Sequence, residues 1–239
     1  MTLKEWIKQS DNIVFFGGAG VSTESGIPDF RSETGIYNTI KRYKCSPEEI
    51  LSHSFFVRKP DVFYDFYKST MLYPDGEPNA AHKALAKLEE MGKLKAIVTQ
   101  NIDGLHQKAG SKRVYELHGT VHRNYCTRCH EFYDMDYILK SDGIPKCKKC
   151  GGIVKPDVVL YEEGLDEMTI RASINAISQA DMLIVGGTSL NVYPAASFIQ
   201  YYRGNKLVLI NKSETPYDSR ANMLIHDSIG KVLGEAIDD

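Results

Sequence analysis

The stretch IVFFGGAGVST, residues 13–23, joins a short apolar run to a glycine-rich turn. Its apolar part, residues 13–16, is rich in β-branched and aromatic residues, as buried strands are. Glycines directly after a strand let the backbone approach a phosphate, and the N-terminus of a following helix offers unpaired N–H groups. Thr23 stands where the standard dinucleotide fingerprint has its third glycine, so a tight strand–helix turn without a ligand remains an alternative.

Three further apolar runs, residues 96–98, 182–185 and 207–210, are also typical of buried strands. Amphipathic helical patterns lie between the strands, at residues 79–91 and 165–179, where apolar side chains recur on one face. Strands that alternate with helices predict an α/β fold, with a parallel sheet covered by helices on both faces.

Each of the four predicted strands runs into an unusual group of residues. The segments that follow them are GGAG at 17–20, TQNID at 99–103, GGTS at 186–189 and NKS at 211–213. In open α/β sheets, ligands bind beyond the carboxyl ends of the strands. Glycines, amides, hydroxyls and a carboxylate at those ends are suited to holding a nucleotide, so we expect a nucleotide site there.

Two stretches do not fit the strand–helix alternation. Residues 36–77 are rich in aromatic side chains and predict a helical insert, whereas residues 119–157 hold paired cysteines and predict a second insert. The chain is therefore expected to divide into a nucleotide-binding domain of residues 1–35, 78–118 and 158–239, interrupted by these two inserts.

The second insert carries two C-x2-C pairs, formed by Cys126, Cys129, Cys147 and Cys150. Each pair directs two thiolates at one centre, and the spacing between the pairs matches a zinc ribbon. A redox pair or a chance pattern is the alternative, but two matched pairs in a short, lysine-rich insert fit a closed metal site better. A closed site with four sulfur ligands leaves no position for water, so we assign this zinc a structural role.

Among the seven histidines, His118 stands out because it follows the strand-like residues 114–117 and precedes Gly119. A histidine at a strand end is a natural general base near neutral pH. His106 is the rival, and the residues alone do not decide between the two. The segment Asp29-Phe30-Arg31 could, on its chemistry alone, be a turn with a solvated charge pair.

The composition is that of an ordinary globular protein, with 42% hydrophobic and 25% charged residues and a formal charge of −2. This charge does not direct the chain toward nucleic acid or an anionic membrane. No apolar run is long enough for a bilayer span, and the N-terminus lacks the apolar core of a secretory signal. We therefore expect a cytoplasmic protein with reduced cysteines and no nucleic-acid or membrane partner.

Together these motifs resemble the sirtuin family, and most closely its compact bacterial and archaeal members. The resemblance extends over essentially the whole chain. Besides the two C-x2-C pairs, it rests on five segments in family order, at residues 18–31, 99–106, 117–119, 187–190 and 192–196.

The resemblance implies an NAD-dependent protein-lysine deacetylase with a Rossmann-like NAD-binding domain and a smaller module that holds the zinc ribbon and the helical insert. NAD would be consumed, and the products would be free lysine, nicotinamide and O-acetyl-ADP-ribose. The acetylated lysine side chain of a partner protein would enter between the two parts, and its peptide would pair as a strand with the chain. The residues expected to contact the peptide are Val159, Tyr161, Asn191, Val192 and Tyr193.

The resemblance also assigns roles to residues of the site. His118 would be the general base, Asn101 would position ribose or water, and Asp103 would hold the nicotinamide carboxamide. Phe30 would shield the reactive carbon from water. The residues expected to bind the nucleotide are Gly18, Ala19, Gly20, Thr23, Asp29, Phe30, Arg31, Gln100, Asn101, Ile102, Asp103, His118, Gly187, Thr188, Ser189, Asn211, Lys212 and Asp227.

Two features of this chain bear on its specificity. It reads Tyr161-Glu162-Glu163 where many relatives carry Phe-Gly-Glu, which puts the detailed shape of the peptide cleft in question. In relatives that remove succinyl groups, a Tyr and an Arg three residues later bind the acyl carboxylate. The matching acyl-pocket residues here are Tyr64 and Tyr67, so we expect a preference for acetyl groups, as we also would if both were core aromatics of the insert.

Three other functions compete with deacetylation. ADP-ribosyl transfer to proteins would use the same NAD site. A zinc-ribbon nucleic-acid binder would need a stronger basic excess and an aromatic–basic stripe. A dehydrogenase is disfavoured by the missing third glycine and the missing ribose carboxylate.

Overall fold

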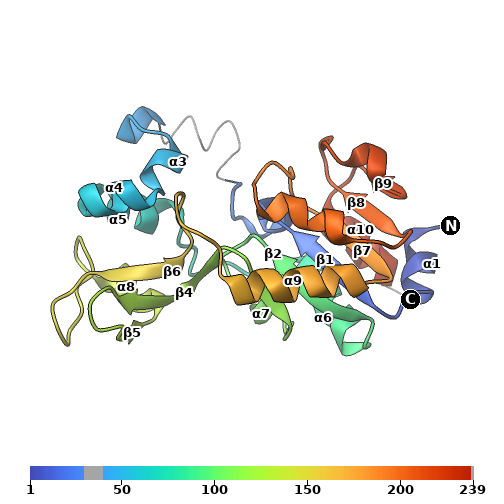
Figure 1. Cartoon of the computed structure of the whole chain (residues 1–239), viewed down its shortest axis with the longest axis horizontal. Coiled ribbons are helices and arrows are strands. Elements are labelled where there is room, and N and C mark those ends of the chain that lie inside the picture. The colour runs from blue at the N-terminus through green and yellow to red at the C-terminus, as the bar shows by residue number, and fades with distance from the viewer. Residues whose placement is uncertain (30–39, 238–239) are drawn as a thin grey trace.

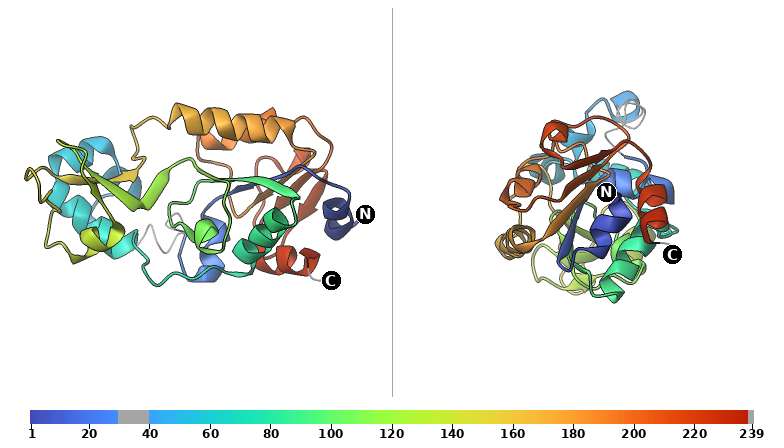
Figure 2. Two further views of the ribbon diagram at one scale, coloured as in Figure 1. Left: turned by 90° about the horizontal axis from the view of Figure 1, so that it is seen from below. Right: turned by 90° about the vertical axis from the view of Figure 1, so that its right-hand side faces the viewer.

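The computed structural model describes residues 1–29 and 40–237. The molecule is elongated, with a six-stranded sheet and its helices at one end and a smaller module with a three-stranded sheet at the other (Figures 1 and 2).

The large sheet is parallel throughout, and its strand order is β3-β2-β1-β7-β8-β9. The chain builds outward from β1 to β3 and then returns to the other side of β1 with β7, so the order reverses between β1 and β7. Such a reversal opens a crevice at the carboxyl ends of the two central strands. The strands are β1 (Ile13–Gly17), β2 (Leu94–Thr99), β3 (Val114–Glu116), β7 (Met182–Gly186), β8 (Leu207–Ile210) and β9 (Met223–Ile225).

Helices cover both faces of this sheet, as Figure 2 shows. Because side chains alternate along a strand, Phe15 of β1 packs in the core under α1, α6 and α10, and Phe16 packs in the core under α9 and η3. The expected α/β fold class is therefore confirmed. These helical elements are α1 (Leu3–Lys8), α6 (Ala80–Glu90), α9 (Glu167–Gln179), η3 (Ala195–Tyr201) and α10 (Ile229–Ile237).

The turn after β1 differs from the expectation. Two short 3-10 helices follow the strand, η1 (Ala19–Val21) and η2 (Thr23–Ser25), where we expected the start of an α-helix. Gly26 then turns the chain with a left-handed φ of 77°, a conformation that glycine adopts at no steric cost. The loop therefore lies over the ends of the strands and does not lead into a long helix.

The small module joins the two inserts around one core. Its antiparallel sheet has the order β5-β4-β6, and its core combines buried side chains of the helical insert with residues of the cysteine insert. Strand β6 ends at Val158, one residue beyond the expected boundary of the second insert. The elements are α3 (Pro47–Ile50), α4 (His53–Arg58), α5 (Pro60–Thr70), β4 (Gly119–Cys126), β5 (Phe132–Tyr133), α8 (Met135–Lys140) and β6 (Val154–Val158).

The structure also contains two short helices, α7 (Leu105–Lys108) after β2 and η4 (Asp218–Arg220) before β9. Among the described residues no helix combines the length and apolar character needed to cross a membrane.

Candidate active site

A pocket of about 300 Å³ lies where the carboxyl ends of the parallel strands face the small module. The loops after β1, β2 and β7 supply its polar wall, which includes Ala19, Gln100, Asp103 and Ser189. The small module supplies a mostly apolar wall that contains Leu51, Thr70, Met71, Tyr73, Val121 and Met135. The site therefore sits at the reversal of strand order, the usual place for a nucleotide in this class of fold.

The glycine turns after β1 and β7 pack backbone against backbone. The N–H of Gly20 donates to the carbonyl of Gly187 at 2.8 Å. A Cβ atom on Gly20 would lie 2.8 Å from the Gly187 Cα, and one on Gly18 would lie 2.9 Å from the Thr188 Cβ. Because no side chain fits between the turns, these glycines let the two loops pack directly against each other, and Ala19 and Gly187 of these loops line the pocket.

Ser22 ties the first loop to the second. Its hydroxyl donates to Oδ2 of Asp103 at 2.7 Å and accepts from Nδ2 of Asn101 at 3.0 Å. The other Asp103 oxygen accepts from the N–H of Leu105, the first residue of α7, at 2.9 Å. Ser22 was not among the expected site residues, although its place directly after the glycine turn was the available signal. The structure thus brings the two expected residues, Asn101 and Asp103, together through a third.

His122 supports the same loop from the small module. Its Nε2 lies 3.0 Å from the Asp103 carbonyl oxygen, and since a carbonyl only accepts, Nε2 is the donor. The ring also lies against Gly104, where an added Cβ would come within 2.6 Å of Nε2. His122 therefore holds the backbone of the Asp103 loop, a role that its sequence position did not indicate.

Thr188 and Asn211 link the ends of β7 and β8. The Thr188 N–H donates to Oδ1 of Asn211 at 3.0 Å, and Nδ2 of Asn211 donates back to the Thr188 carbonyl at 2.8 Å. Nε2 of Gln100 lies 3.4 Å from the Thr188 hydroxyl oxygen. The reciprocal pair fixes the GGTS loop, and Asn211 acts here by shaping the loop and does not line the pocket.

His118 is half-buried and lines the pocket. Its Nδ1 lies 2.9 Å from the backbone carbonyl oxygen of Gln100, so Nδ1 carries the proton of the neutral ring. The lone pair of that ring is then on Nε2, the atom that accepts a proton when a histidine acts as a general base. The backbone of the second loop therefore sets the tautomer that base catalysis needs.

His106, the rival candidate, lies in the protein interior with 1% of its surface exposed. Its ring packs 4.8 Å from that of His82 and 6.1 Å from that of Phe15, between ring centroids. Burial, together with the neighbouring His82, lowers the pKa of His106 to about 3. A histidine that does not reach the pocket and does not protonate near neutral pH is unsuited to the chemistry, so the structure favours His118.

The remaining expected residues separate into three groups. Four of the five expected peptide contacts line the pocket, namely Val159, Tyr161, Val192 and Tyr193, whereas Asn191 does not. Of the nucleotide residues, Asp29, Ile102 and Gly187 line it, and Phe30 and Arg31 lie outside the described residues. The expected residues that lie away from the pocket lining are Gly18, Gly20, Thr23, Asn211, Lys212 and Asp227.

Asp227 is engaged locally at the start of α10. Its carboxylate accepts from the Ser228 N–H and from the Lys231 ammonium, each at 2.7 Å. Both carboxylate oxygens of Asp227 thus have hydrogen-bond partners in the same segment, and its role in binding the nucleotide stays a prediction.

Tyr64 and Tyr67 do not line the pocket. They are 1% and 0% exposed, in the aromatic core of the small module, and the Tyr64 hydroxyl donates to the Val154 carbonyl. This burial in the aromatic core leaves the assignment of both tyrosines to the acyl pocket a prediction. It matches the alternative in which both tyrosines are core aromatics.

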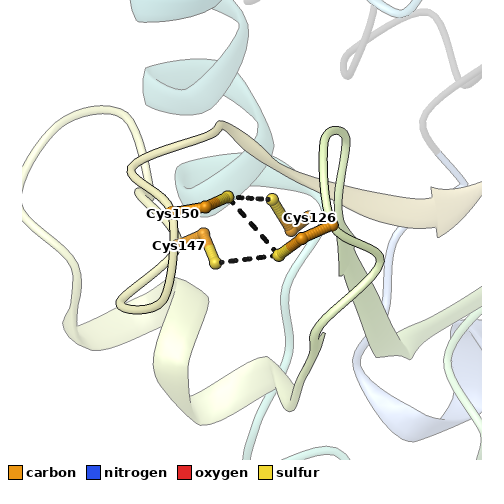
Figure 3. Close-up of side chains that lie close together, drawn as sticks. Cys126, Cys147 and Cys150 are labelled. Carbon is orange, nitrogen blue, oxygen red and sulfur yellow. Dashed lines mark hydrogen bonds between the residues drawn. The ribbon is translucent and has the colours of Figure 1, made fainter.

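The four paired cysteines converge on one point of the small module (Figure 3). Their sulfur atoms lie within 4.8 Å of one another, with separations of 3.4 to 3.5 Å for three of the pairs. A disulfide needs about 2 Å between sulfurs, and tetrahedral zinc at about 2.3 Å from each ligand needs roughly 3.8 Å. The Arg128 N–H and the Tyr133 hydroxyl donate to two of these sulfurs, which favours the thiolate form. The four sulfur donors and the distances between them therefore fit a structural zinc ion.

Comparison with known proteins gives a consistent result. The model of the Sir2 family matches residues 18–194. An "NAD-dependent protein deacetylase" of Clostridium perfringens is 68% identical over 237 residues, which is 99% of this chain and 97% of the relative. One of Clostridium acetobutylicum is 64% identical over 98% of this chain and 96% of the relative.

Solved structures agree with these sequence matches. A crystal structure of a Sir2 homolog–NAD complex superposes with a TM-score of 0.88 at 36% identity, over 98% of this chain and 91% of that one. A Sir2 enzyme with a peptide and NAD+ gives a TM-score of 0.87 at 39% identity, over 99% and 98%.

Proposed function

The chain belongs to the Sir2 family, and we propose that it removes acetyl groups from protein lysines with NAD as a consumed co-substrate. The observation that carries this proposal is the convergence of His118 and three strand-end loops on one pocket between the sheet and the small module. The products are free lysine, nicotinamide and O-acetyl-ADP-ribose. The enzyme uses NAD as an ADP-ribosyl donor, so no hydride is transferred.

The loops after the strands are suited to hold NAD. The backbone N–H groups of the glycine turns after β1 and β7 would bind the phosphates, since Ala19 and Gly187 of these turns line the pocket. Thr188, Ser189 and Gln100 offer hydroxyl and amide groups along the same wall. The Asp103 backbone and side chain, fixed by Ser22 and His122, would hold the nicotinamide carboxamide.

The reaction needs a base on the ribose side of the pocket. The acetyl oxygen is a poor nucleophile and attacks the ribose carbon as nicotinamide leaves and positive charge develops there. His118 then takes a proton from a ribose hydroxyl through Nε2, so that this oxygen attacks the linked acyl carbon. Addition of one water and departure of the lysine amine then leave the acetyl group on the ribose as an ester. The hydrogen bond from Nδ1 to the Gln100 carbonyl keeps the ring oriented for that transfer. Asn101 would position ribose or water.

The acetylated peptide would lie between the two parts of the molecule. Val159 and Tyr161 follow β6, Val192 and Tyr193 follow β7, and all four line the same pocket. An extended peptide between them would be held by backbone hydrogen bonds, with Asn191 at the rim.

The zinc ion of the cysteine site would hold the small module together and take no part in the chemistry, since four thiolates leave no open ligand position. We divide the chain into an NAD-binding domain of residues 1–35, 78–118 and 158–239, a helical insert of 36–77 and a zinc ribbon of 119–157. We also propose that the enzyme acts in the cytoplasm, in keeping with unpaired, metal-ligating cysteines.

NAD labelled in its adenine half tests the reaction against ADP-ribosyl transfer at the same site. The proposal expects the label in a small acetylated ADP-ribose, with formation that depends on acetylated peptide. Label that stays on the protein or peptide would instead support transfer.

A further inference from the structure

The turn at residues 160–163 has an unusual residue at its centre. Glu162 adopts a left-handed backbone with φ of 76°, although it is not glycine. A side chain in this region adds steric strain that glycine does not have. Glycine would adopt the same backbone without that strain.

The Glu162 carboxylate is held by the helical insert. Oε2 accepts from the Ser54 N–H at 2.9 Å, and Oε1 accepts from the Ser54 hydroxyl at 3.0 Å. Ser54 lies in the first turn of α4, where N–H groups lack partners within the helix. These two bonds lower the pKa of Glu162 below its usual value, so the carboxylate is charged at neutral pH.

Glu163 makes a second set of contacts on the same turn. Its carboxylate accepts from the Leu160 N–H at 2.9 Å and from the Lys155 ammonium at 3.1 Å, and it lies 2.8 Å from Nδ1 of His53. Adjacent glutamates therefore fasten the turn to α4 on one side and to β6 on the other.

Much of the backbone of the turn is hydrogen-bonded within the protein. The Tyr161 N–H donates to the Leu51 carbonyl, the Tyr161 carbonyl accepts from the His53 N–H, and the Glu163 N–H donates to the Leu160 carbonyl. Within the described part of the chain, the N–H and C=O of Glu162 have no hydrogen-bond partner. Glu162 also lines the pocket.

We propose that Glu162 is a positioning residue for the acylated peptide, whose strand docks on the backbone of Glu162 while its side chain anchors that backbone to α4. The inference rests on the proposed deacetylase function and deepens it. The side chain does not touch the reacting atoms, so its loss weakens peptide binding and leaves the handling of NAD and the chemical step intact.

Substitutions at Glu162 distinguish the effect of its two hydrogen bonds with Ser54, which we call the anchor, from the effect of its left-handed backbone. Glu162→Ala keeps the strained backbone and loses both bonds, and should raise the peptide KM about tenfold. Glu162→Gln retains an oxygen that accepts from the Ser54 N–H and should return the peptide KM to within about twofold of wild type. Glu162→Gly relieves the strain without restoring the anchor, and should give an intermediate KM even if the alanine variant folds poorly.

Each variant is assayed with peptide varied at saturating NAD and with NAD varied at saturating peptide. The matched control is Glu167→Ala, which removes an exposed carboxylate from α9 that pairs only with Arg171 among the described residues and lies outside the pocket. The control should match wild type, and the NAD KM and kcat should stay within about twofold in all variants.

Three results would overturn the inference: an unchanged peptide KM in Glu162→Gly, an equal rise in the peptide and NAD KM values, or a glutamine variant as impaired as alanine. Peptide binding by fluorescence anisotropy is measured on the same proteins. A wild type that binds acetylated peptide and frees no lysine would refute the deacetylase function alone, because the order of the variants in binding still tests Glu162.

Discussion

The large sheet and the small module are stabilised in different ways. Both faces of the sheet are closed by helices, and the alternating side chains of β1 enter one core on each face. The small module has one core, which the helical insert and the cysteine insert share. Two thiols of the four-cysteine cluster, those of Cys126 and Cys147, are buried in this core. The sheet can therefore be stable through apolar burial alone, whereas the module also needs its metal.

The two regions also divide the work of the site. His118, Asp103 and Thr188 follow strands of the sheet, and they supply polar groups to the pocket. The small module supplies an apolar wall and the anchors of the peptide turn. Substitutions in a strand-end loop should therefore lower the rate of the chemical step. Substitutions in the small module should instead weaken binding of the peptide substrate.

The largest effect should come from the base. His118→Ala is expected to lower deacetylation by about 10²–10⁴, the usual value of a positioned base, while the fold stays intact. His106→Ala should harm the chemical step less, because His106 lies in the core. Single-turnover rates and circular dichroism on both variants check this, and the reverse order of the two rates would show the assignment to be wrong.

The choice of acyl group should give the next largest effect. The residues that line the pocket in the described ranges include no lysine or arginine, and they include Asp29, Asp103, Glu162 and Glu163. A succinyl carboxylate would lose its hydration there without gaining a cation. We expect kcat/KM for acetyl-lysine to exceed that for succinyl-lysine by about 10², or about 2.7 kcal/mol in transition-state binding.

Comparable efficiencies on the two peptides would contradict this preference. Tyr67→Arg provides a separate check on the placement of Tyr67. Because Tyr67 is fully buried, the guanidinium should destabilise the module and fail to raise succinyl activity. A gain in succinyl activity would return Tyr67 to the acyl pocket.

Loss of the metal should affect the module more than the sheet. Cys126→Ser, or a strong chelator, is expected to unfold the strands around the cysteine site and remove most of the activity. Binding of NAD to the sheet should suffer less than binding of peptide. Metal analysis should give about one zinc per chain. Full activity in a protein shown to be free of zinc would disprove the structural role.

The smallest effect concerns the pH dependence of the sheet domain. His106 is neutral when buried, with a pKa of about 3, whereas its unfolded pKa is about 6.5. Between these values the unfolded chain binds the extra proton, so the free energy of unfolding falls as the pH drops, by up to about 1.4 kcal/mol per pH unit from this group.

Urea unfolding at pH 7.5 and pH 5 measures that slope in the wild type and in His106→Leu. Neither ring nitrogen of His106 has a hydrogen-bond partner among the described residues, so leucine removes the titration without breaking a bond. The variant should lose less stability on acidification. Equal losses in the two proteins would show that His106 does not contribute.

The sequence predicted the sheet well because its signals are local. Short apolar runs marked β1, β2, β7 and β8, and Asn79 and Asp166 are the caps of the helices expected there. Helix α10 was not expected, and one of its terminal N–H groups, that of Gly230, is capped by Glu24 from the loop after β1. A contact between such distant parts of the chain leaves no local pattern.

Prediction of the site from the sequence has the same limit, because contacts between distant residues leave no local pattern. Spacing alone predicted the four cysteines, because both pairs are local. The bond from Ser22 to Asp103, the support from His122 and the burial of His106 and Tyr67 all depend on tertiary packing. Residue types therefore indicated the chemistry, and tertiary packing determined that His118 lies in the pocket and His106 in the core.

The central claim is that lysine deacetylation is coupled to the consumption of NAD. The most direct test incubates the enzyme with acetylated peptide and NAD and follows nicotinamide, free lysine and O-acetyl-ADP-ribose together by mass spectrometry. The account predicts equal amounts of the three products, and none when NAD or the acetyl group is left out. Lysine freed without NAD, or nicotinamide released at the same rate without acetylated peptide, would contradict it.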